Sequence, residues 1–156
     1  MSLDAESSAR PVSTTATASL ARVRQGSLAV LVLLVAEYGI GMYVNLYVTI
    51  PKADHGHGLG SAIANGPAML SIHAVIGLLL GLAALGVLAQ AIARHLGAIA
   101  SSAAGLIALG FASAAGASFT RSGQPAESMG MSVLTGVGLL CYAANLYLLR
   151  PPRQRR

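Results

Sequence analysis

Residues 69–91 read MLSIHAVIGLLLGLAALGVLAQA, an apolar run that contains no Asp, Glu, Lys or Arg. A helix rises about 1.5 Å per residue, so about 20 such residues cross the hydrocarbon core of a bilayer, which is about 30 Å thick. Lipid admits only helices and closed barrels, because every backbone polar group must find a partner within the protein. The run does not alternate polar and apolar residues, so it predicts a transmembrane helix.

Three further runs have the same character, and the four together predict an all-α integral membrane protein, a four-transmembrane-helix bundle. The expected spans are 26–50, 69–91, 96–119 and 129–149. Composition agrees with this class, because 54% of the residues are hydrophobic and only 10% are charged. Residues 1–25 are rich in Ser, Thr and Ala, so we expect a disordered tail there. Residues 150–156 are expected to form a short basic tail.

The basic residues are unevenly divided between the two sides of the predicted bundle. Most of the 10 Lys and Arg lie before the first span, between the second and third, or after the fourth. Only Lys52 and Arg121 lie in the other two loops. Positive residues stay on the cytoplasmic side, so we expect both termini in the cytoplasm and loops 51–68 and 120–128 outside. This orientation explains the net charge of +5, and no basic stripe with interleaved aromatic residues indicates nucleic-acid binding.

Small residues recur within the spans at helical spacing. In lipid, close approach of helix backbones across small residues provides much of the packing. We therefore expect helix contacts at small residues in the last three spans, with span 96–119 approaching its neighbours most closely. The glycines concerned are Gly77, Gly81, Gly105, Gly116 and Gly136. Besides the lipid bilayer, a protein partner or a homo-oligomer is expected.

Glu37 lies near the centre of the first span. A charged side chain at that depth costs about 2.5–3.5 kcal/mol, so we expect Glu37 to face the bundle, on the same face as Asn45. Equal depth from the outer ends of the first and fourth spans places Tyr142 beside Glu37, with Asn145 one turn further. We predict a hydrogen-bonded intramembrane polar cluster of Glu37, Asn45, Tyr142 and Asn145. Such a cluster either joins the helices through hydrogen bonds or forms part of a relay for protons or cations.

The sequence Ala36-Glu37-Tyr38-Gly39, central in the first of four short spans, resembles small multidrug resistance transporters. Those carry a membrane-embedded glutamate in the first helix, where protons and cationic drugs compete for it, and the resemblance implies this role for Glu37. It covers only these residues. The chain has no Trp, which that family carries in its third span. The charge bias and the long first outer loop also leave little room for dual orientation, so we assign the chain to no family from its sequence.

Four residues on the predicted outer side offer metal ligands: Asp54, His55, His57 and His73. Imidazole and carboxylate groups suit zinc or copper. A haem held by His73 and either His55 or His57 is a second possibility. His73 cannot share a haem with His95, which lies about 33 Å away along one helix. The alternative is a solvated loop, a buried and hydrogen-bonded His73, and no cofactor.

The sequence contains no catalytic Ser/His/Asp set, no phosphate-binding glycine loop and no paired carboxylates. The lone Cys141 is expected to be a small core side chain. These features favour a non-enzymatic subunit or assembly factor of a larger membrane complex. Two alternatives remain: a small proton- or cation-coupled transporter or relay that uses Glu37, and an outer-face metal- or haem-binding protein that uses His55, His57 and His73. The Ala- and Gly-rich composition favours a bacterial cell membrane.

Overall fold

A computed structural model describes residues 14–48, 59–94 and 97–150 of the chain, and most of these residues form helices. The long helices are α1 (Thr14–Tyr47), α3 (Ala68–Ala93), α4 (Ile99–Ser122) and α5 (Pro125–Leu148), and the short α2 (Leu59–Asn65) precedes α3. In the described part of the chain, four helices are long and apolar enough to cross a membrane.

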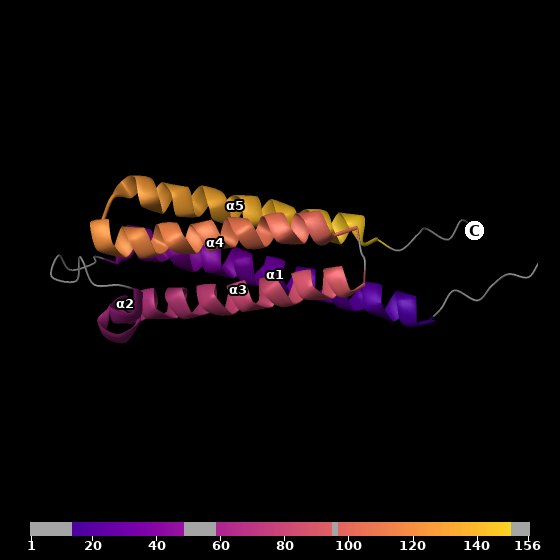
Figure 1. Ribbon diagram of the computed structural model, residues 1–156. Helices are drawn as coiled ribbons and strands as arrows, with labels where there is room; N and C mark the ends of the chain where they lie inside the picture. Colours follow the sequence, from indigo (N-terminus) through magenta and orange to yellow (C-terminus); the bar gives the residue numbers. More distant parts are fainter. Residues whose placement is uncertain (1–13, 49–58, 95–96, 151–156) are drawn as a thin grey trace, which may run out of the picture.

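The long helices alternate in direction and surround one interior (Figure 1). α1 contacts α3 and α5, α4 contacts the same two helices, and α4 and α5 pack most closely. We call the end of the bundle that holds Arg24, Arg94 and Arg150 the terminal end. The opposite end, with α2 and the turn between α4 and α5, is the loop end (Figure 1).

The helix ends differ from the predicted spans by a few residues. Residues 14–25, predicted to be disordered, form the first turns of α1, because Ala, Leu, Arg and Gln favour helix and the downstream span supplies the nucleus. α1 ends at Tyr47, whereas the predicted span ran to Ile50. α5 begins at Pro125, four residues earlier than predicted, since proline suits the first position of a helix. Before it, Gly123 ends α4 with a left-handed φ of 65°.

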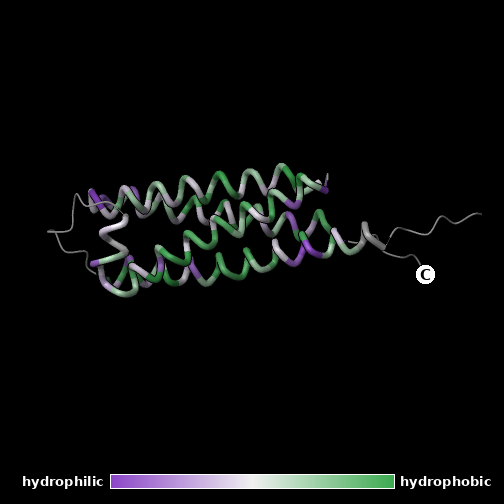
Figure 2. The backbone as a smooth tube through the Cα atoms, turned by 60° about the horizontal axis from the view of Figure 1, so that its bottom comes forward, coloured by the Kyte–Doolittle hydropathy of each residue, from purple (hydrophilic) through white to green (hydrophobic). Residues whose placement is uncertain are grey.

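The surface of the bundle is as apolar as its interior. The core contains Val30, Leu34, Leu80 and Ala84, yet many large apolar side chains, Leu140 among them, point outward. Figure 2 shows hydrophobic residues along the middle of the helices and hydrophilic residues gathered towards their ends. A soluble monomer rarely exposes so much contiguous apolar surface, so this distribution fits a bundle surrounded by lipid.

Three of the five glycines expected at helix contacts lie where a neighbouring side chain comes close. A Cβ at Gly105 would lie 2.8 Å from Tyr142 Cε2, and one at Gly116 would lie 3.1 Å from Met131 Sδ. Gly77 faces Glu37. Gly81 and Gly136 do not fit the prediction, because a Cβ there would meet nothing within 4 Å. Gly81 and Gly136 have the four-residue spacing from other small residues that is typical of a helix contact, but no neighbouring side chain lies against them.

Candidate functional site

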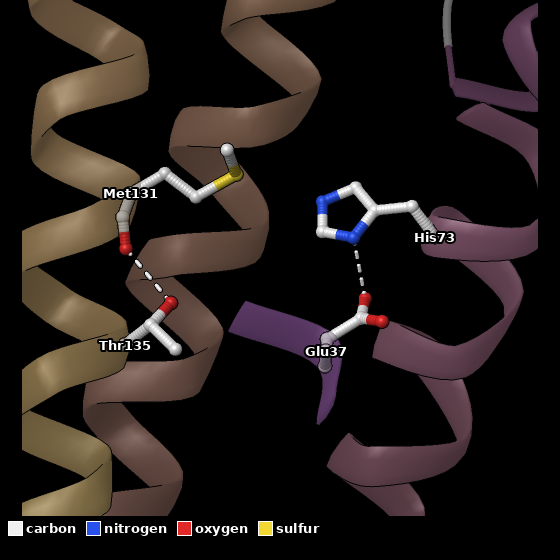
Figure 3. Close-up of polar contacts among 4 residues, drawn as sticks. All are labelled: Glu37, His73, Met131 and Thr135. Carbon is white, nitrogen blue, oxygen red and sulfur yellow. Dashed lines mark hydrogen bonds and ion pairs between the residues drawn. The ribbon is translucent and has the colours of Figure 1, made fainter. Parts of the chain in front are cut away.

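Glu37 and His73 form an acid–base pair inside the bundle. Glu37 Oε1 lies 2.7 Å from His73 Nδ1, which joins α1 to α3 (Figure 3). Glu37 is only 6% exposed. An imidazole this close to the carboxylate offsets part of the cost of placing the carboxylate at this depth.

Two glycines make room for this pair. A Cβ at Gly41 would lie 3.0 Å from His73 Cε1, and a Cβ at Gly77 would lie 3.4 Å from Glu37 Oε1. Each polar side chain therefore lies over a glycine of the other helix. Both helices carry the same spacing in sequence, a polar residue followed by glycine four positions later. Because α1 and α3 are antiparallel, Gly41 lies beside His73 and Gly77 lies beside Glu37. The two polar side chains are therefore offset along the bundle by about one helical turn.

The pair lines a cavity of about 180 Å³ between all four long helices. Most of its wall is apolar, and it also includes Asn45, Ser128 and Thr135. Figure 3 shows the imidazole and the thioether of Met131 facing each other across the space between α3 and α5. The lining residues belong to the loop-end half of the bundle. On the terminal side, Leu34 and Leu80 line the cavity and are themselves almost fully buried.

The pair is not fully satisfied by the protein. Among the described residues, Glu37 Oε2 and His73 Nδ1 are both buried without a hydrogen-bond partner, because the 2.7 Å approach of Nδ1 to Glu37 Oε1 lacks the alignment of a hydrogen bond. The second ring nitrogen of His73, Nε2, points away from Glu37 in Figure 3. A buried polar atom without a partner costs about 1–3 kcal/mol, which is recovered when a water or a ligand supplies the missing donor.

Asn145 belongs to a separate polar cluster in the terminal half. Its Nδ2 donates to Ser102 Oγ at 2.9 Å and to Ser27 Oγ at 3.4 Å, and its Oδ1 accepts from Ser101 Oγ. Asn145, Ser27 and Ser102 are fully buried. This cluster ties together α1, α4 and α5. Its serines were not predicted, although three hydroxyls in apolar spans at the depth of Asn145 are a usable signal.

Asn45 and Glu127 hold the loop end together. Ser128 Oγ donates to Asn45 Oδ1 at 2.8 Å, which joins α5 to α1. Glu127 accepts hydrogen bonds from Ser118, at 2.7 Å, and from Ser122, so it links the two ends of the turn between α4 and α5. Asn45 and Ser128 line the loop-end side of the cavity, whereas Glu127 and its two serines do not line it.

The predicted cluster of Glu37, Asn45, Tyr142 and Asn145 is therefore corrected. Glu37 pairs with His73, and the Tyr142 hydroxyl is buried without a hydrogen-bond partner among the described residues. The error lies in the helix ends. Measured from Tyr47 and Pro125, the depth of Glu37 corresponds to Thr135, which does line the cavity. Tyr142 is seven residues beyond Thr135, about 10 Å further along α5.

The predicted metal or haem site can be followed only in part. Asp54, His55 and His57 lie outside the described residues, and His73 lies against Glu37. Within 14–48, 59–94 and 97–150, no group of three His, Cys, Asp or Glu side chains could hold a metal ion. The described part of the chain offers His73 Nε2 as a single imidazole ligand facing the cavity.

Comparison of the chain with protein families, with curated proteins and with solved structures found no match.

Proposed function

We propose that this protein is a non-enzymatic membrane subunit that takes up and releases protons through Glu37 and His73. The observation that carries the proposal is the 2.7 Å contact between a buried carboxylate and an imidazole at a cavity between the helices. Ionisable groups inside a membrane protein are costly and commonly mark proton or ion pathways. An acid and a base in contact can hold a proton and pass it on.

The cavity supports this function because it has room for water. At about 30 Å³ per molecule, 180 Å³ corresponds to about six waters. The cavity extends from Glu37 to Asn45 and Ser128 near the loop end, so waters there can connect the pair with that side. Leu34 and Leu80 close the other side. The arrangement fits proton exchange with one side of the membrane better than an open channel.

The basic residues support an orientation in which this side is the cell exterior. Arg22, Arg24, Arg94 and Arg150 lie at the terminal end, and among the described residues only Arg121 lies at the loop end. We therefore propose that both termini lie in the cytoplasm, and the Ala- and Gly-rich composition favours a bacterial cell membrane. We expect tags fused to the two termini to be accessible only from the cytoplasmic side of the membrane.

Proton uptake measured on purified protein in nanodiscs tests the function. A pH-sensitive dye reports protons bound after a small pH jump, and infrared difference spectra report the carboxyl group directly. We expect Glu37→Gln to remove the carboxyl signal and its share of the proton uptake. Glu127→Gln is the matched control, because it makes the same chemical change outside the cavity and should leave the Glu37 signal intact.

A purely structural role for the pair makes the opposite prediction. The glutamine side chain introduced by Glu37→Gln can still hydrogen-bond to His73, so a pair that only joins helices would survive the substitution with its partner complex and its activity in cells unchanged. Loss of function in cells with normal assembly of the variant is what proton handling requires. Normal function of Glu37→Gln in cells would contradict the proposal.

A further inference from the structure

The cavity reaches the outer surface of the bundle between α3 and α4. Two of its lining residues, Leu78 on α3 and Ser113 on α4, are exposed on the outside of the bundle. Leu78 has 64% of its surface exposed. Counted from the loop ends of their helices, Leu78 and Ser113 lie at nearly the same depth as Glu37. We call this opening between Leu78 and Ser113 the lateral window.

The size of the cavity selects a class of ligand. An apolar cavity of about 150 Å³ is large enough to bind benzene. The present cavity of about 180 Å³ therefore accommodates one six-membered ring with a small substituent. Val44, Leu109 and Phe119 supply apolar contacts for such a ring.

The chemistry of the pair selects the polar group on that ring. Glu37 Oε2 is a buried acceptor without a donor. A hydroxyl can supply this donor without bringing a second charge into the apolar cavity. An ammonium group would have to be desolvated beside His73, the other ionisable side chain of the lining, which is unfavourable when the imidazole is protonated.

We propose that the cavity binds the hydroxyl-bearing ring of a lipid-soluble phenol or hydroquinone. The hydroxyl donates to Glu37, the ring fills the apolar part of the cavity, and the apolar tail leaves through the lateral window into the bilayer. This inference rests on the proposed function, because the pair that exchanges protons is also the group that recognises the ligand.

Titration calorimetry in nanodiscs tests the proposal with three probes that share one tail: para-hexylphenol, hexylbenzene and para-hexylbenzylamine. Empty nanodiscs provide the correction for partitioning into lipid. We expect one molecule of hexylphenol to bind per chain, at least about tenfold more tightly than hexylbenzene. Hexylbenzene has no hydroxyl and therefore cannot donate a hydrogen bond to the Glu37 carboxylate. Glu37→Gln should weaken hexylphenol binding by a smaller factor, because the amide oxygen still accepts from the hydroxyl but carries no charge, and Glu127→Gln should not change it.

The window is tested by a pair of substitutions on α3. Leu78→Trp narrows the opening and should slow or abolish binding. Leu79→Trp is the matched control, since Leu79 is also exposed on α3 but does not line the cavity. Equal binding by these two variants would overturn the lateral entry.

Three results would overturn the ligand class. They are equal binding of hexylphenol and hexylbenzene, tighter Glu37-dependent binding of hexylbenzylamine, and no saturable binding of any probe. Proton uptake without probe is measured on the same preparations, so the two proposals fail separately. Uptake that depends on Glu37 without phenol binding removes the ligand proposal only. Phenol binding that depends on Glu37 without proton uptake removes the proposed function and leaves the binding site.

Discussion

Substitution of Gly41 by alanine tests whether the pair depends on the space that glycine leaves. The new Cβ would lie 3.0 Å from His73 Cε1 and 3.5 Å from its Nε2. Carbon atoms pack best at about 3.5–4.0 Å, so the ring must move by about 0.5–1 Å. A shift of this size away from α1 lengthens the 2.7 Å contact with Glu37 to about 3.2–3.7 Å, which weakens the attraction between the two side chains.

The energetic consequence follows from two opposing effects. Alanine favours a helix over glycine by about 0.5–1 kcal/mol. Overpacking costs about 1–3 kcal/mol in a filled interior, and less than the upper value is expected here because Gly41 and His73 line the cavity, into which the ring can move. We therefore expect Gly41→Ala to lower the free energy of unfolding by up to about 2 kcal/mol and to weaken proton uptake by the pair.

Gly39→Ala is the matched control, because a Cβ at Gly39 would meet nothing within 4 Å. Steric trapping in bicelles measures the free energy of unfolding, and the nitrogen chemical shifts of His73 report the contact. Gly39→Ala should be neutral or slightly stabilising, with unchanged His73 shifts. If the two variants gave the same stability and the same shifts, the reasoning about the glycine-lined contact would be refuted.

Two further substitutions test how the helices are held together. Gly105→Ala places a Cβ 2.8 Å from Tyr142 Cε2 and should lower the free energy of unfolding by about 1–3 kcal/mol. Gly110→Ala, where a Cβ would meet nothing within 4 Å, should not lower it. Equal effects of the two substitutions in a steric-trapping measurement would contradict the α4–α5 packing. Asn145→Ala removes hydrogen bonds to three serines and should cost about 1–2 kcal/mol, because each such bond contributes about 0.6 kcal/mol in a membrane protein. Asn45→Ala removes one hydrogen bond and should lower the free energy of unfolding by about a third as much as Asn145→Ala. If Asn45→Ala lowered it more than Asn145→Ala, the loop end would contribute more of the stability than the Asn145 cluster.

The sequence was sufficient to predict the helical bundle because hydropathy acts over whole spans. An error of a few residues at an end does not change the number of helices. It does change which side chains meet. Predicted ends at Ile50 and Met129 placed Tyr142 at the depth of Glu37, whereas the observed ends at Tyr47 and Pro125 place Thr135 there. The inward direction of Glu37 was predictable, because a carboxylate exposed to lipid is costly. Its partner, His73, was not predictable.

The cavity could not be predicted from the sequence at all. Its volume depends on which small residues face inward, and the spacing of glycines alone does not separate Gly41 and Gly77 from Gly81. The register between α1 and α3 decides this, and it is set by contacts between residues far apart in the chain. The lateral window depends in addition on Leu78 and Ser113, which belong to different helices and carry no motif.

The fully buried hydrogen bonds of Asn145 lie in the half of the bundle away from the cavity. The Asn145 cluster supplies interhelical hydrogen bonds at a distance from the cavity, whereas the chemistry of the cavity depends on Glu37 and His73. Substitutions among the apolar residues that line the cavity leave the hydrogen bonds of Asn145 and its serines in place, because none of these four residues lines the cavity. A scaffold divided in this way is free to acquire a new ligand while its assembly is preserved.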